Sequence, residues 1–416
     1  MDVAKLQSAV VDAARLRSVD PSRGTNQTGV RLYNERLALS LIRRHGSLAK
    51  AEIARLTGLS AQTISVIMRQ LEADGLVQKE APQRGKIGQP SVPFSLNPNG
   101  AFFLGLKIGR RSSDLVLIDF LGRPMQSLHE PYRYPSPSAV LDFSACAIET
   151  LVAALPRRSR ARISGIGIAA PFELWNWEEQ IGAPRAVLDG WRSFDIKEEI
   201  GRICEWPVYF CNDATAACGA ELVLGNPKHY LDFLYFFLGS FVGGGVVLNG
   251  SLYPGRTGNA GALGSLPVPA NAAGSVASQQ LIRSASIYVL EEHMKSAGRE
   301  PSVLSRSPED WSGVGRELDR WIVQAAESLA AATVAAISVI DFEAVIIDGA
   351  FPREVRRRIV EATAAAVERF DRQGLSPVAI AEGSIGSDAR AIGGACLPLL
   401  ASFTRDRELL FKESLG

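Results

Sequence analysis

Apolar positions near the start of the chain recur every three to four residues, which is the spacing of amphipathic helices. The pattern predicts a helix over 30–45 and two shorter helices over 50–57 and 61–73. Ser47 and Ser60 stand where N-caps of the second and third helices are expected. The third helix is expected to bury a stripe of four apolar side chains, Ile64, Ile67, Met68 and Leu71.

After these helices the pattern changes to short extended runs. Two strands are predicted over 76–79 and 92–96, and a basic, glycine-rich loop over 83–90 lies between them. Beyond a strong turn at 97–100, continuous apolar runs alternate with alanine-rich helices, which is typical of α/β folds. Buried strands are predicted at 102–108, 114–119, 163–168, 208–211, 235–238, 246–248 and 344–347.

Composition indicates a globular protein of more than one domain. The chain has 416 residues, of which 46% are hydrophobic and 21% are charged, and this excludes a disordered or fibrous protein. A single hydrophobic core rarely grows beyond roughly 300 residues, so the part after the turn at 97–100 is expected to form two lobes.

Charge is divided unevenly along the chain, although the net charge of the whole is only +1. Residues 1–97 contain 14 Lys and Arg against 8 Asp and Glu, whereas the remaining residues contain 31 against 36. The excess of positive charge at one end suits contact with a polyanion.

The three helices, the tight turn and the two strands have the order of a winged helix-turn-helix DNA-binding domain. The outer face of the third helix carries polar side chains that can read base edges in the major groove, namely Gln62, Thr63, Ser65 and Arg69. Contacts with DNA phosphates or with a neighbouring groove are expected from Arg43, Arg44, Lys50, Arg55, Arg84, Lys86 and Gln89. The alternative is a protein-interaction module whose charged face is only solvated.

Cysteine and histidine usage predicts neither a metal site nor a cofactor. The five cysteines include no Cys-x-x-Cys pair and the four histidines are scattered, so reduced thiols in a cytoplasmic protein are expected. The N-terminus lacks the apolar core of a signal peptide. The most apolar stretch, 231–248, contains Asp232 and four glycines, which argues against a membrane-spanning helix.

Three features of the α/β part suggest a site for a small ligand, and each has an ordinary structural alternative. Asn212 and Asp213 follow the strand at 208–211, where they can hold sugar hydroxyls or cap the next helix. The glycine-rich run 239–245 can form an anion-binding nest or a hairpin turn. Gly167 follows a strand as part of a glycine motif, for which tight packing is the alternative.

Taken in order, these motifs resemble the ROK family of repressors, open reading frames and sugar kinases. The resemblance extends from about Gly24 to Leu400, and its motifs lie at 24–27, 88–90, 96–98, 165–171, 190–191, 212–214, 239–245, 250–253, 344–349 and 383–388. It implies an actin-like, ribonuclease-H-like fold of two lobes with a sugar in the cleft. It also implies that a chain with an N-terminal winged helix is a transcriptional regulator that forms dimers or tetramers.

The resemblance sets the expected domain boundaries within an α/β fold class. An N-terminal arm is expected over 1–27, a winged helix-turn-helix over 28–97, a first lobe over 98–213 and a second lobe over 214–388. The C-terminal helix, 389–416, is expected to pack back on the first lobe.

The chain departs from the family's kinases where those hold phosphate and sugar. An Asp-x-Gly-Gly-Thr phosphate loop is replaced by Lys-Ile-Gly-Arg-Arg at 107–111, whose bulky side chains keep the backbone away from a triphosphate. The sugar-contacting Glu and His become Ala262 and Ser265. The cysteine-rich zinc loop is replaced by 267–273, without cysteine or histidine, and a later family glutamate corresponds to Gln280.

These observations favour a cytoplasmic DNA-binding transcriptional regulator, a repressor and not an enzyme, that senses a sugar, polyol or related small molecule. A sugar kinase with an added DNA-binding domain and Asp213 as general base is the second hypothesis, and a ligand-blind architectural DNA-binding protein is the third. A modified ligand is favoured over an empty site, because a buried Asp213 without a partner is costly. The ligand-binding candidates are Asn212, Asp213, Gly167, Gly243, Gly244 and Gln280.

Overall fold

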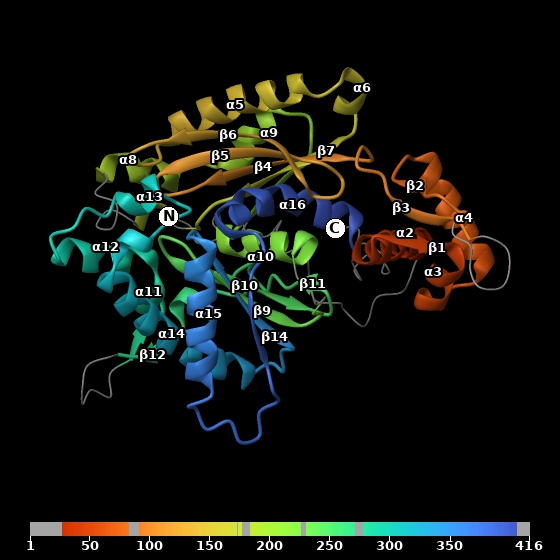
Figure 1. Cartoon of the computed structure of the whole chain (residues 1–416). Coiled ribbons are helices and arrows are strands. Elements are labelled where there is room, and N and C mark those ends of the chain that lie inside the picture. Colours follow the sequence, from red (N-terminus) through yellow and green to blue (C-terminus); the bar gives the residue numbers. More distant parts are fainter. Residues whose placement is uncertain are drawn as a thin grey trace. The chain divides into compact units, whose positions relative to one another are not determined.

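The computed structural model of the protein describes residues 27–82, 91–172, 174–176, 184–225, 230–270 and 278–405 (Figure 1). The chain divides into two compact units, one made of 1–211 with 394–416 and the other of 212–393. The first unit contains the winged helix and a five-stranded β-sheet, and the second unit contains another five-stranded sheet.

The winged helix has the predicted helices and strands, together with one short strand that was not predicted. The three strands form an antiparallel sheet in the order β1-β3-β2. The elements are α2 (Gln27–His45), β1 (Ser47–Ala49), α3 (Lys50–Thr57), α4 (Ala61–Ala73), β2 (Val77–Lys79) and β3 (Pro93–Leu96).

The capping role expected for Ser47 is wrong, whereas that of Ser60 is confirmed. Ser47 is the first residue of β1, and α3 follows Ala49, which makes no side-chain capping bond. A strand of three residues is too short for its alternation to stand out between two helices. Ser60 caps α4, since its Oγ accepts a 3.1 Å hydrogen bond from the amide of Thr63.

The first unit is built on a mixed sheet in the order β6-β5-β4-β7-β8, in which β4 pairs antiparallel with β5 and parallel with β7. The strands are β4 (Phe102–Ile108), β5 (Ser112–Ile118), β6 (Pro124–Pro131), β7 (Ile163–Ala169) and β8 (Val208–Cys211). The helices and 3-10 turns are α5 (Pro137–Ala154), α6 (Arg157–Arg160), η2 (Leu174–Asn176), α8 (Arg185–Asp189), η3 (Gly190–Arg192) and α9 (Ile196–Ile203).

The central strand β4 distributes its side chains over two hydrophobic layers. Phe102 and Leu104 belong to a core that also contains residues of α5 and α9. Phe103, on the other face, packs edge to face against Phe403, the last residue of α16 (Ala389–Phe403), with ring centroids 5.8 Å apart. α16 from Gly394 onward therefore belongs to the first unit.

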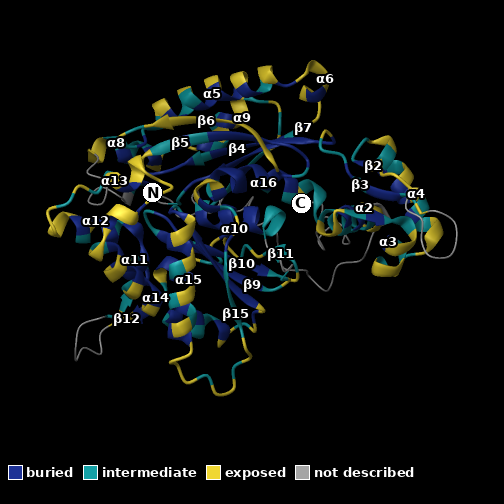
Figure 2. Cartoon of the chain, in the orientation of Figure 1, coloured by how far each residue is buried: buried dark blue, intermediate teal, exposed yellow. Residues whose placement is uncertain are grey.

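α5 is the one helix among the described residues with the length and composition of a membrane span. Its Val140, Ala147, Ile148 and Leu151 are buried in the core of the first unit. Figure 2 shows exposed residues along the outer side of α5. Packing against the sheet thus accounts for its apolar residues.

The second unit repeats the strand order of the first, with a sheet β11-β10-β9-β14-β15. In each sheet the first three strands in sequence pair antiparallel and the last two join in parallel. The main strands are β9 (Phe233–Leu238), β10 (Val242–Leu248), β11 (Ser251–Leu252), β14 (Ala344–Gly349) and β15 (Ala379–Glu382), and β12 (Pro267–Pro269) and β13 (Ser278–Gln280) form a separate pair. This duplicated order confirms the predicted actin-like α/β class.

Helices cover both faces of the second sheet. One layer includes residues of α10, and the other includes residues of α12, α14 and α15. The helices and 3-10 turns are α10 (Asp213–Leu224), η4 (Leu263–Ser265), α11 (Ile282–Ala285), α12 (Ile287–Ser296), α13 (Val303–Arg306), η5 (Ser312–Val314), α14 (Arg316–Ile337), α15 (Arg353–Val367) and η6 (Gly386–Asp388).

The glycine-rich run of this sheet has the hairpin alternative and not the anion-binding nest, because 239–241 connect the antiparallel strands β9 and β10. Gly243 and Gly244 lie inside β10, in register with Phe237 and Phe236 of β9. Successive N–H groups of a strand point to opposite edges, so they cannot converge on one anion. Glycine serves close packing here, since a Cβ on Gly243 would lie 2.7 Å from the Cβ of Ala214 on α10.

Arginines bind the winged helix to the first lobe through backbone carbonyls. Arg43 of α2 donates a 2.8 Å hydrogen bond from Nη2 to the carbonyl of Phe120 and lies over that ring. Arg162 donates from Nη1 to the carbonyls of Asp74, at 3.1 Å, and Gly100, at 3.0 Å. Because Asp74 is the C-cap residue of α4, these bonds fix α4 relative to the first lobe.

Arg43 keeps its charge in a buried position. Burial lowers the pKa of its guanidinium to about 10, which leaves the group protonated at neutral pH. A buried charge is stable only when it is paired or hydrogen-bonded, so the carbonyl of Phe120 and Arg43 depend on each other.

We therefore expect Arg43→Met to loosen the winged helix from the first lobe. The substitution leaves the buried carbonyl of Phe120 without its donor, at a cost of about 1–3 kcal/mol. Hydrogen exchange along α2 measures the effect, and exchange there should be faster than in the wild type. Arg69→Met, at an exposed position of α4 in the same winged helix, is the matched control. Unchanged exchange in Arg43→Met would contradict the docking role.

Candidate functional site

α4 presents the predicted polar face to solvent. Gln62 and Arg69 are exposed, and Ser65 is half-buried. Thr63 takes part in the cap, because its hydroxyl shares a 2.8 Å hydrogen bond with that of Ser60. The opposite stripe is buried as predicted, with no residue more than 5% exposed, and consists of Ile64, Ile67, Met68 and Leu71. α4 is thus anchored by one face while the other is open to a partner.

The basic residues around α4 divide into exposed and engaged side chains. Arg44 and Arg55 are exposed, as a phosphate contact requires. Lys50 is half-buried, with its Nζ 5.4 Å from the centre of the Phe94 ring. Arg43 is committed to the first lobe, and this placement argues against the phosphate contact expected from it. The predicted wing residues Arg84, Lys86 and Gln89 lie outside the described residues.

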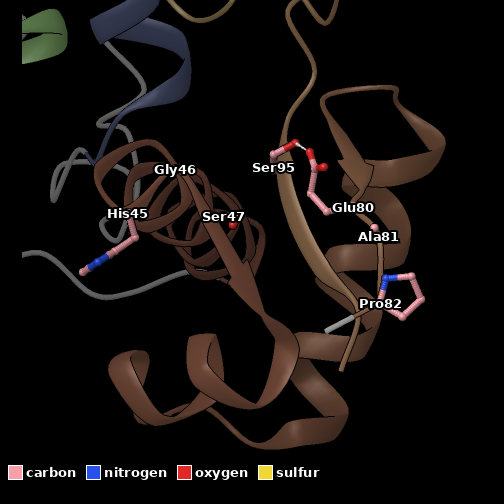
Figure 3. A pocket seen from close by; sticks show the side chains of 7 residues that line it. All are labelled: His45, Gly46, Ser47, Glu80, Ala81, Pro82 and Ser95. Carbon is pink, nitrogen blue, oxygen red and sulfur yellow. Dashed lines mark hydrogen bonds between the residues drawn. The ribbon is translucent and has the colours of Figure 1, made fainter. Parts of the chain in front are cut away.

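A pocket of about 450 Å³ opens on the winged helix, beside the end of α2 and the strands β1 to β3 (Figure 3). The carboxylate of Glu80 lies in its wall and accepts a hydrogen bond from the hydroxyl of Ser95. A negative charge there opposes a phosphate, so the pocket does not extend the face predicted to bind DNA. The lining residues are His45, Gly46, Ser47, Glu80, Ala81, Pro82 and Ser95.

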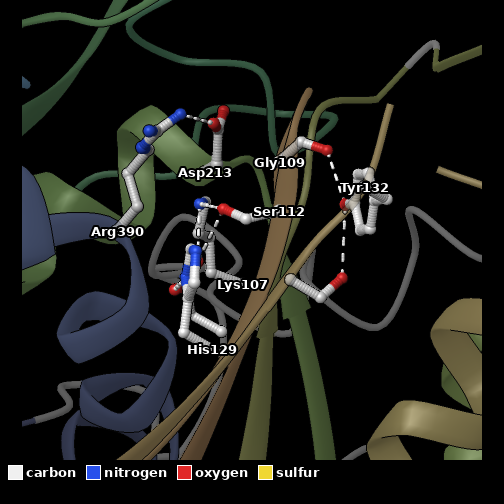
Figure 4. Close-up of polar contacts among 9 residues, drawn as sticks. Lys107, Gly109, Ser112, His129, Tyr132, Asp213 and Arg390 are labelled. Atoms are coloured by element: carbon white, nitrogen blue, oxygen red, sulfur yellow. Dashed lines mark hydrogen bonds and ion pairs between the residues drawn. The ribbon is translucent and has the colours of Figure 1, made fainter. Parts of the chain in front are cut away.

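Asp213 begins α10 in the second unit, and an arginine binds it (Figure 4). Its Oδ2 lies 3.2 Å from Nη1 of Arg390, in the first turn of α16. The side chains are 15% and 17% exposed, respectively, and Arg390 also lies over the ring of Phe237 at 5.2 Å. The expectation that Asp213 lacks a partner is therefore wrong, because its charge is balanced within the second unit.

Asn212 has the capping role that the sequence left open. Its Oδ1 accepts a 3.1 Å hydrogen bond from the amide of Ala214, at the start of α10. The two N–H donors of the side chain take no part in this cap.

The sequence did not predict a role for Arg390, because it stands 177 residues from Asp213 and belongs to none of the recognised motifs.

The other predicted ligand residues have packing or surface roles. A Cβ on Gly167 of β7 would lie 3.0 Å from the Cβ of Leu397 on α16 and would also collide with the carbonyl of Gly394. Gln280 is exposed on β13, in register with Pro267 of β12. Neither placement supports a contact with a ligand.

At 107–111, where the resemblance to the ROK family predicts the position of a phosphate loop, the first unit has a tight hairpin with internal partners (Figure 4). Lys107 donates from Nζ to Asp114 Oδ2 at 2.6 Å and to Ser112 Oγ at 2.8 Å. The amide of Gly109 donates to the carbonyl of Ser112 at 2.9 Å, and the carbonyl of Gly109 accepts from Tyr132 at 2.7 Å. These backbone groups are therefore already used and cannot cradle a phosphate.

Asp114 keeps the charge of Lys107 balanced at neutral pH. Burial by itself raises the pKa of this carboxyl, but the charge of Lys107 and the hydrogen bonds from His129 and Lys107 outweigh it. The net effect holds the pKa of Asp114 below its usual value, so the group is ionised. Nδ1 of His129 lies 2.5 Å from the second carboxylate oxygen. Lys107 is thus one partner in an ion pair and no free cation.

Two protein families match separate parts of the chain. Residues 33–86 match the MarR family. This range begins within α2 and includes α3, α4 and β2 of the winged helix. Residues 103–280 match the ROK family, which covers β4 to β13. The first match contains α4, and the second contains Lys107 and Asp213.

Proteins similar to this chain include one uncharacterized protein and some that are named as regulators. An uncharacterized protein of Sinorhizobium fredii, y4fQ, is 25% identical over 89% of this chain and 91% of its own length. The xylose repressor of Bacillus spizizenii is 26% identical over 59% of this chain, which spans just under two thirds, 63%, of the repressor. In fold, the chain resembles a ROK family transcriptional regulator described as a homolog of the E. coli MLC protein. The TM-score is 0.63 and the identity is 20%, and the match covers 90% of this chain and 97% of the regulator.

Proposed function

We propose that this chain, which carries a MarR-type winged helix followed by a ROK-family domain, is a DNA-binding transcriptional regulator that acts as a repressor. The observation that carries the proposal is α4, whose exposed face holds Gln62 and Arg69 while its C-terminus is bound to the first lobe. Relatives named repressors support the sign of regulation. A regulator that binds the chromosome acts in the cytoplasm of a bacterium. A dimer or tetramer would place two α4 helices on one operator.

Gln62 is expected to read a base, as its exposed amide can pair bidentately with adenine. Gln62→Ala should weaken binding to a DNA site selected by the wild type by about fivefold to 150-fold, the equivalent of about 1–3 kcal/mol. Binding to unrelated DNA, measured by fluorescence anisotropy at the same salt concentration, should not change.

Gln126→Ala, at an exposed position of β6, is the control for this measurement and should bind like the wild type. An equal loss on selected and unrelated DNA would give Gln62 a positioning role. No loss on either would contradict the proposal that α4 reads DNA.

The effector proposed for the ROK-family domain is a sugar or a related polyol, bound at Asp213. A carboxylate accepts hydrogen bonds from neighbouring hydroxyls, and the salt bridge to Arg390 occupies Oδ2 and leaves Oδ1 outside the pair. The donors of Asn212 that take no part in the cap lie on the adjacent residue. The name of the xylose repressor supports a sugar as effector class.

A route for regulation is suggested by α16, which carries residues of both units. Arg390 in its first turn binds Asp213 in the second unit. Phe403 at its end packs on Phe120 in the first unit, and Phe120 also receives Arg43 of the winged helix. A ligand that competes with Arg390 for Asp213 therefore acts on the helix that supports the DNA-binding module, which is linkage between two sites.

Asp213→Ala should abolish the effect of a sugar on DNA binding. Calorimetry and thermal-shift screening with sugars and polyols identify the ligand, and DNA release is then measured with and without it. Asp310→Ala, at an exposed site of the same unit, should respond like the wild type. If no sugar or polyol binds and Asp213→Ala leaves DNA release unchanged, the sensor part of the proposal is wrong.

A sugar kinase is the second candidate, favoured by the carboxylate of Asp213 at the start of α10. Against it stand the closed hairpin at 107–111 and the paired state of Asp213. We expect no sugar-dependent ATP turnover in a coupled assay. Turnover that Asp213→Asn abolishes would overturn the assignment as a non-enzymatic regulator.

A further inference from the structure

One large apolar side chain, that of Val66, is exposed on the outer face of α4. Val66 is 56% exposed, although Gln62, one turn before it, and Arg69, one turn after it, are polar. Residues at these spacings share one face of a helix, so the valine lies between the two side chains proposed to meet DNA. Single exposed apolar residues are common, and the position of Val66 within that face is what distinguishes it.

Folding does not explain the valine. Val66 lies outside the buried stripe of α4, and a β-branched residue is a weaker helix former than alanine. At an exposed position no packing compensates for this difference. Val66 therefore contributes little to the stability of the winged helix. A role for it is sought in the contact of α4 with a binding partner.

The chemistry of the major groove supplies one apolar partner. Base edges there present nitrogen and oxygen donors and acceptors, and the only apolar group is the C5-methyl of thymine. A valine against any other base edge displaces water from polar groups without pairing them, which is unfavourable. Because its χ1 is restricted, valine loses little freedom when it is held against a methyl group.

From this placement we infer that Val66 is a specificity residue that contacts the C5-methyl group of one thymine in each half-site. The inference rests on the proposed DNA-binding function. Residues 62 and 66 are about 6 Å apart along the helix axis, and base pairs are about 3.4 Å apart, so the thymine lies on the order of two base pairs from the base read by Gln62.

Uracil tests the inference, because it differs from thymine only by the missing methyl group. DNA sites are first selected by the full-length wild type from genomic fragments, and each thymine is then replaced singly by uracil in a synthetic duplex. At one position in each half-site, uracil should weaken wild-type binding by about threefold to fivefold, as expected for loss of one buried methyl group. Val66→Ala should bind the thymine and uracil forms of that position equally.

Val323→Ala is the matched control, since Val323 on α14 is 57% exposed and lies outside the winged helix. It should retain the wild-type preference for thymine. Val66→Ala is expected to fold at least as stably as the wild type, because alanine suits an exposed helix position better, and thermal unfolding checks this.

Two results would overturn the inference while leaving the proposed function intact. One is sequence-selective binding by the wild type with no thymine whose methyl group matters. The other is a preference for thymine over uracil that Val66→Ala retains. This outcome includes a variant that keeps the preference but differs from the wild type in oligomeric state. Failure of the wild type to select any DNA sequence would instead overturn the proposed function, and the inference with it.

Discussion

A guanidinium buried at its inner side holds the winged helix to the rest of the first unit. Arg43 reaches the carbonyl of Phe120, and the ring of Phe120 lies against Phe403 at 4.9 Å between centroids. Separation of the two parts would leave the charge of Arg43 and the carbonyl without each other. The position of α4 therefore depends on the lobe as well as on its own sequence, so a change in the lobe is able to affect the helix that is proposed to read DNA.

α16 is the second constraint, and small residues define it. A Cβ on Gly393 would collide with the carbonyl of Ala216 in the second unit, and Gly394 lies close to Gly105 and Gly167 in the first. Such close approaches leave the helix little room to shift within either unit. The Arg390–Asp213 pair stands at the beginning of this helix. The structural role of α16 and its proposed regulatory role thus involve the same helix.

The sequence predicted the elements whose signals are local. α3 and α4 have the predicted bounds, because the tight turn at Gly58 ends α3 and a capping serine and a strong apolar stripe mark α4. It did not predict β1, whose three residues are defined by pairing with β3, or the strand conformation of Gly243 and Gly244. Consecutive glycines predict a loop from the sequence alone. Here they stand in a strand because α10 packs too closely on β10 to leave room for a Cβ at Gly243.

The candidate site was harder to predict than the fold, because its important contacts join distant parts of the chain. Gln62 and Arg69 were recognised from helical spacing alone, and their exposure is as expected. Arg390 and the commitment of Arg43 to Phe120 involve residues separated by 177 and 77 positions, for which a single sequence gives no signal. Val66 belongs to neither the predicted buried stripe nor the predicted polar face, so helical spacing alone gave it no role.

The most direct test of the central claim is a map of the sites that the full-length protein occupies on its own genome, obtained by immunoprecipitation and sequencing. A sequence-reading regulator predicts discrete sites that share one motif and lie beside genes whose expression changes when the protein is removed. Two results would contradict the account. One is enrichment of bound DNA by the wild type that is no greater than by the double variant Gln62→Ala/Arg69→Ala, and the other is a signal spread evenly over the chromosome.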